Sequence, residues 1–78
     1  MSRTLTSPRH RALVALIIAE RKKAGLTQWD VATKLRRAQS IVSTLESGER
    51  RIDVVEFLEL AEVIGFDPRK ALAQLLKF

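Results

Sequence analysis

The sequence contains no cysteine and a single histidine, His10. Without cysteine, disulfide bonds and cysteine-ligated zinc sites are excluded, and a reducing compartment fits the composition. No acidic cluster accompanies the histidine, so we expect His10 on the surface, with no catalytic or metal-binding role. Glu56, Glu59 and Glu62 have the spacing of a solvated helix face and no nucleophile beside them. We therefore expect no enzyme, no metal and no cofactor.

Long apolar segments are also lacking, and the longest apolar run is ALVALIIA at residues 12–19. This run is far shorter than the ~20 residues that a membrane-spanning helix needs. Arginines precede it, as in a signal peptide, but the charged residues 20–23 follow where a signal peptide has small residues. We therefore expect a soluble cytoplasmic protein with no membrane partner.

Positive charge exceeds negative charge, with a net charge of +5 over 78 residues. Residues 1–25 contain six lysines and arginines against one acid, whereas residues 53–78 contain three against five. This asymmetry suits an oriented polyanion binder, and a solvated charged surface explains it equally well. A chain of this length forms one small domain of marginal stability, so pairing with a partner or a second copy would help.

The apolar residues recur with helical spacing, and no segment has the period of two that marks a strand. Ser7 with Pro8 marks one helix start, and Asp67 with the proline after it marks another. Glycines mark helix ends at positions 25, 48 and 65. The sequence therefore predicts an all-α domain with five helices, at about residues 8–24, 28–35, 39–47, 53–64 and 68–77.

The helices expected at 28–35 and 39–47 are separated by three residues, the length of a helix-turn-helix connection. In that motif the second helix enters the major groove of DNA and needs compact polar side chains, with basic residues at its flanks. The expected base-facing residues are Gln39, Ser40, Ser43 and Thr44. The expected phosphate contacts are Thr27, Gln28, Arg36, Arg37, Arg50 and Arg51, with Arg3 as a further candidate.

The segments GLTQWDVATKL (residues 25–35) and QSIVSTLESGERRIDVVEFLELAEVIGFDP (residues 39–68) resemble the phage-repressor and Cro type of helix-turn-helix domain. This type is also called the xenobiotic-response-element (XRE) family. The resemblance spans about residues 13–70 and implies a five-helix, lambda-repressor-like fold. It also implies that Gln28 clamps the DNA backbone, that residues 39–44 face bases, and that Arg21 and Glu46 form a structural ion pair.

Arg36 and Ala38 depart from the pattern of this family, and Trp29 has two possible orientations. Arg36 stands where the family usually has glycine, in a turn that tends to need positive φ, so either the turn differs or strain is accepted. Ala38 gives the helix at 39–47 a weak N-terminal cap. We expect Trp29 to lie against a neighbouring helix or turn, with an outward position against DNA or a protein as the alternative.

These observations predict a sequence-specific DNA-binding transcriptional regulator, with repression as the expected mode. We expect a homodimer on double-stranded DNA, reading a near-palindromic operator through the major groove. The candidate dimer contacts are Leu72, Leu75, Leu76 and Phe78, for which a place in the core is equally expected. The alternative is an antitoxin-like or other protein-interaction module, whose main partner is a toxin or a polymerase subunit.

Overall fold

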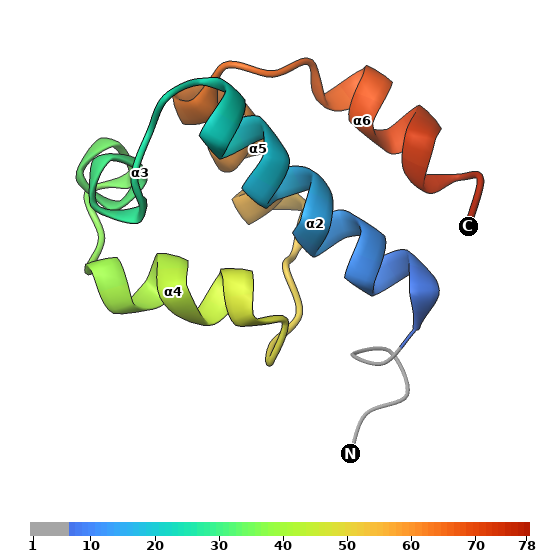
Figure 1. The fold of residues 1–78 in the computed structure, drawn as a ribbon, viewed down its shortest axis with the longest axis horizontal. Helices are drawn as coiled ribbons and strands as arrows, with labels where there is room; N and C mark the ends of the chain where they lie inside the picture. Colours follow the sequence, from blue (N-terminus) through green and yellow to red (C-terminus); the bar gives the residue numbers. More distant parts are fainter. Residues whose placement is uncertain (1–6) are drawn as a thin grey trace.

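A computed structural model describes residues 7–78, and Arg3 lies outside the described residues. Their five helices are α2 (Pro8–Lys23), α3 (Gln28–Leu35), α4 (Gln39–Ser47), α5 (Val54–Ile64) and α6 (Pro68–Leu75) (Figure 1). The all-α prediction is confirmed, and the bounds of α3 and α4 agree with it. The other three helices differ from prediction by one or two residues at one end. None of these helices is long and apolar enough to cross a membrane.

Side-chain caps explain most of the helix starts. Ser7 accepts a hydrogen bond from the backbone N–H of His10, and Asp67 accepts one from Arg69. α3 and α5 begin with complete capping boxes, which satisfy backbone donors at both helix starts. Because Asp53 is the cap of α5, this helix begins one residue later than predicted. α4 begins at Gln39, and the residue before it, Ala38, provides no side-chain cap, as the sequence predicts.

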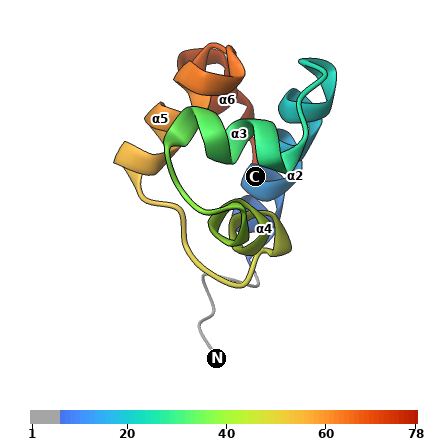
Figure 2. The same cartoon turned by 90° about the vertical axis from the view of Figure 1, so that its left-hand side faces the viewer.

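The hydrophobic core lies where α2, α3, α4 and α5 meet, and its most deeply buried members are Val31, Val42 and Leu60. Burying each of these side chains stabilises the fold by about 1.5–3 kcal/mol. α3 and α4 pack against each other, and both views place α4 and α6 on opposite sides of α2 (Figures 1 and 2). The exposed face of α4 is therefore separated from α6 by the core.

Two side chains lie elsewhere than the sequence suggested, and a third takes one of its two expected places. His10 is not a surface residue: it is only 7% exposed, and its Nε2 lies 3.3 Å from the carbonyl oxygen of Gly48. Trp29 does not pack inward and is 69% exposed, because Val31 and its neighbour in sequence occupy the inner face of α3. Leu75 is buried, so this candidate dimer contact belongs to the core of its own chain.

Candidate nucleic-acid interface

The turn between α3 and α4 is held in the left-handed conformation by a residue that is not glycine. Arg36 has φ 58° and ψ 43°, and it is the only such residue among those the structure describes. The turn is closed by backbone hydrogen bonds from Arg36 to Thr33 and from Arg37 to Ala32. A left-handed backbone costs a residue with a Cβ about 1–2 kcal/mol. The turn therefore has the geometry that glycine favours, and Arg36 carries the backbone strain.

Replacing Arg36 with glycine is expected to stabilise the protein and to weaken its binding to DNA. Removing about 1 kcal/mol of backbone strain should raise Tm by about 4–8 °C. Affinity for DNA falls as the salt concentration rises. If Arg36 contacts a phosphate, the plot of log affinity against log salt concentration should become shallower by about one unit of slope in the variant. Thermal unfolding and salt-dependent DNA binding measure the two effects separately.

Arg37→Gly is the matched control, because it removes the same charge at the neighbouring position, where φ is not positive. This variant should gain no stability. Equal stabilisation of both variants would contradict the assignment of strain to Arg36.

α4 divides cleanly into an inner and an outer face. Val42 and Leu45 are buried against the other helices, whereas Ser40 and Ser43 are exposed. Thr44 is half-buried, and its hydroxyl donates to the Ser40 carbonyl oxygen at 2.8 Å. With its hydroxyl proton engaged, Thr44 presents chiefly its methyl group. The outer face therefore offers small hydroxyl and methyl groups of the size that a DNA groove accepts.

A chain of polar contacts joins α2 to the start of α4. Arg21 donates to both carboxylate oxygens of Glu46, at 2.6 and 2.8 Å, and this is the ion pair that the resemblance implied. Gln28 donates from Nε2 to Glu46 Oε1 at 3.0 Å. Gln39 in turn donates from Nε2 to Gln28 Oε1 at 2.7 Å. These four residues, which we call the recognition network, reach from the protein interior to the first residue of α4.

The ion pair within the recognition network is shielded from water. The side chains of Arg21 and Glu46 are 12% and 6% exposed. Hydrogen bonding to Glu46, opposed by burial, raises the pKa of Arg21 above its ordinary value, so the guanidinium stays charged. Arg21 also donates to the Leu26 carbonyl oxygen at 2.9 Å, which fixes the loop before α3.

The arginines that were expected to contact phosphates differ in their surroundings. Arg50 is engaged by Glu56 at 2.5 Å, and this contact raises the pKa of Arg50. Glu56 also belongs to the capping box of α5, so the pair closes the segment between α4 and α5. Arg37 lies 4.0 Å from Glu59, and both side chains are well exposed, which makes this a weak pair. Arg36 and Arg51 are exposed.

The first turn of α3 is held by the capping box between Thr27 and Asp30. Thr27 accepts from the Asp30 backbone N–H at 3.1 Å and donates its own N–H to Asp30 Oδ2 at 2.8 Å. These bonds to Thr27 lower the pKa of Asp30, so the carboxylate stays charged at neutral pH. Sequence reasoning assigned separate roles to Gln28 and Gln39 and missed their contact. The available signal was that each is the first residue of its helix.

Comparison with known proteins agrees with this geometry. A family model described as a helix-turn-helix domain matches residues 3–75. A solved structure described as an XRE-family like protein from Pseudomonas syringae pv. tomato str. DC3000 is 41% identical, with a TM-score of 0.88. The alignment covers 96% of this chain and 92% of that one. The chain belongs to the XRE family of helix-turn-helix proteins. A search of curated proteins gives no match.

Membership identifies this XRE-family protein as a DNA-binding regulator, with α3 and α4 as its helix-turn-helix. The resemblance read from the sequence is thereby confirmed. The particular DNA contacts of its side chains stay predictions. Within residues 7–78, no group of three or more His, Cys, Asp and Glu residues is arranged to hold a metal ion.

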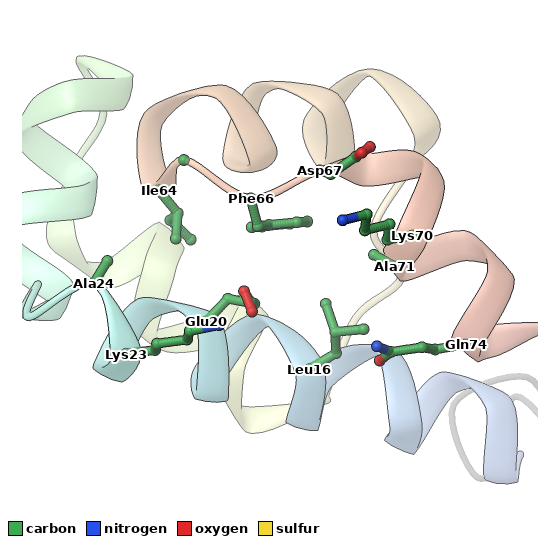
Figure 3. A pocket seen from close by; sticks show the side chains of 11 residues that line it. Leu16, Glu20, Lys23, Ala24, Ile64, Phe66, Asp67, Lys70, Ala71 and Gln74 are labelled. Atoms are coloured by element: carbon green, nitrogen blue, oxygen red, sulfur yellow. The ribbon is translucent and has the colours of Figure 1, made fainter.

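This XRE-family protein also has an open cleft of about 480 Å³ between α2 and α6 (Figure 3). Glu20 and Lys70 reach into it from opposite walls, and Leu16 and Phe66 form apolar surface between them. The cleft is lined by α2, Ile64 at the end of α5, the segment before α6, and α6 itself. No residue of α3 or α4 lines it, so it lies apart from the exposed face of α4.

Proposed function

We propose that this protein is a sequence-specific transcriptional repressor that binds a near-palindromic operator as a homodimer. The observation that carries this proposal is the recognition network, which holds the Gln39 amide at the start of α4. A side chain that is already oriented loses less conformational freedom on binding than a mobile one. Repression would follow from occupancy of the operator by the protein.

The bases that Gln39 can recognise depend on the amide groups that its hydrogen bond to Gln28 leaves available. One N–H of its amide is donated to Gln28, which leaves the carbonyl oxygen and a second N–H. Adenine presents one acceptor and one donor in the major groove, and a glutamine amide matches both. We assign adenine reading to Gln39, thymine-methyl contact to Thr44, and base or phosphate contacts to Ser40 and Ser43.

Phosphate contacts surround this base-reading surface in our proposal. The start of α3, with Thr27 and Gln28, supplies the positive end of a helix dipole. Arg36, Arg37 and Arg51 supply charge. The pairing of Arg50 with Glu56 supports a different role, in which Arg50 fixes the segment after α4 and contacts phosphate secondarily.

We assign the dimer interface to α6 and the groove beside it. Leu72, Leu76 and Phe78 are 49%, 74% and 61% exposed. Leu72 and Leu76 line an apolar groove of about 490 Å³, to which Leu13 and Ile52 also contribute. Reading two half-sites on one face of DNA would require the two α4 helices of such a dimer to lie about 34 Å apart, one turn of DNA.

The dimer proposal predicts that Leu72→Glu combined with Leu76→Glu yields a folded monomer in sedimentation experiments. Both leucines are exposed, so the charges should leave the fold intact while preventing burial in an apolar interface. Val54→Glu combined with Val55→Glu is the matched control, because these α5 side chains are also largely exposed. An unchanged mass for the leucine variant, or dissociation of the valine variant alone, would overturn the assignment to α6.

Selection of bound duplexes from a random DNA library at near-physiological salt tests the whole proposal. Enrichment of a two-fold symmetric motif would support a dimeric, sequence-specific regulator. A single half-site would keep the sequence-specific reading and contradict the dimer. Binding without enrichment, lost as salt rises, would leave only phosphate attraction. That last outcome would favour the interaction-module function, with a protein as the main partner.

A further inference from the structure

Trp29 is a large aromatic side chain that the recognition network leaves unused. It is 69% exposed, and it is the only exposed large hydrophobic residue on α3 or α4 in the described chain. The remaining ones lie on α5 and α6, or just beyond the end of α6. Tryptophan is well buried on average in folded proteins, so an indole left mostly in water is unusual.

The position of Trp29 places its ring at the edge of the DNA-facing surface. It is the second residue of α3 and directly follows Gln28, whose side chain turns toward α4 to join the recognition network. Successive residues of a helix point about 100° apart, so the indole projects to the side of that network. Thr33 is exposed one turn further along α3, and the exposed Arg36 follows the end of the helix in its left-handed C-cap.

The surroundings of Trp29 fit a nucleic-acid backbone better than a protein. A stable protein interface needs a contiguous apolar patch, and α3 and α4 expose no large apolar side chain besides Trp29. The positive end of α3 on one side and Arg36 on the other complement a phosphate chain. An indole combines an apolar face with a single N–H donor, which matches the apolar sugar and the acceptor oxygens of that chain.

We propose that Trp29 is a DNA-backbone contact, with its ring against a deoxyribose and its Nε1–H donating to a phosphate oxygen. This inference rests on the proposed function and adds a positioning residue to it. Backbone contacts fix the register of a protein on the duplex without reading sequence. Trp29 therefore sets how α4 enters the groove, while the choice of bases stays with the side chains of α4.

The experiment uses the absence of tyrosine and the presence of one tryptophan, which make protein fluorescence a report on Trp29 alone. A fluorescein-labelled duplex of about 20 bp, or two turns, is titrated with the full chain. It carries either the sequence enriched from the random library or a scrambled sequence at low salt. Label anisotropy reports binding, and tryptophan emission reports a change around the indole.

Binding should quench or shift the emission, and Trp29→Ala should weaken binding to both duplexes by about tenfold, or about 1.4 kcal/mol. Trp29→Phe, which keeps an apolar ring and loses the N–H, should recover part of this loss. The base preference of both variants should match that of the unaltered protein. Val54→Ala, at a residue exposed to a similar degree on α5, is the control and should bind normally.

Two outcomes would overturn the inference, and they differ in what else they overturn. In the first outcome, the label anisotropy rises as expected but the tryptophan emission does not change, and Trp29→Ala binds within twofold of the unaltered protein. This outcome would remove Trp29 from the interface and leave the proposed function standing. A changed base preference in Trp29→Ala would likewise contradict a backbone role. No anisotropy rise with the unaltered protein on either duplex removes both the inference and the proposed function.

Discussion

Glu46→Ala is expected to lower the free energy of unfolding by about 3–5 kcal/mol, because it leaves Arg21 charged and buried without its partner. The side chains of Arg21 and Glu46 are 12% and 6% exposed, so water cannot easily replace the lost carboxylate. Whole domains are stable by only about 5–15 kcal/mol, so this single change should bring the protein close to unfolding. Tm should fall by more than about 12 °C.

Chemical denaturation of Glu59→Ala supplies the control for that prediction. Glu59 lies 4.0 Å from Arg37 and both side chains are well exposed, so its loss should cost less than about 1 kcal/mol. Both variants remove one carboxylate that faces one arginine, and they differ mainly in burial. Equal losses in the two variants would show that the Arg21–Glu46 pair contributes no more than a surface pair does.

Gln39→Ala is expected to reduce affinity for the operator by about 1–3 kcal/mol, or about 5- to 150-fold, while binding to unrelated duplexes changes little. The loss is specific because alanine cannot match the donor and acceptor of adenine. Gln39 is half-buried at the start of α4, outside the core, so the fold should persist. Titration of operator and scrambled duplexes at one salt concentration gives the two affinities.

Gln74→Ala is the matched control, since Gln74 is an exposed glutamine on α6, far in the fold from α4. Gln28→Ala tests the recognition network itself, because it removes the acceptor that orients Gln39. If the network acts as a unit, the double variant should lose less affinity than the sum of the single losses. Strict additivity would mean that Gln28 and Gln39 act independently.

Local rules explain why the helices could be predicted so closely. The capping pattern of Thr27 with Asp30 and the left-handed glycine after α4 act within a few residues, and such signals can be read from sequence. The family resemblance supplied the Arg21–Glu46 pair, which joins residues far apart in the chain. Its buried position could not be derived from composition or periodicity.

The features that sequence reasoning missed depend on how helices lie against one another. His10 is buried because the end of α4 approaches the first turn of α2, a contact between distant parts of the chain. The bond between Gln28 and Gln39 likewise depends on the angle between α3 and α4. Leu75 and Leu76 are neighbours in an apolar run, and only the docking of α6 decides that the first is buried and the second exposed.

The uncapped start of α4 depends on the helix before it. Because Ala38 offers no side-chain acceptor, the first turn of α4 lacks about 1 kcal/mol of local stability that a serine there would provide. The hydrogen bond from Gln39 to Gln28 ties the same turn to α3. The order of the base-reading end of α4 is therefore borrowed from α3, and hydrogen exchange at its first amides would record that dependence.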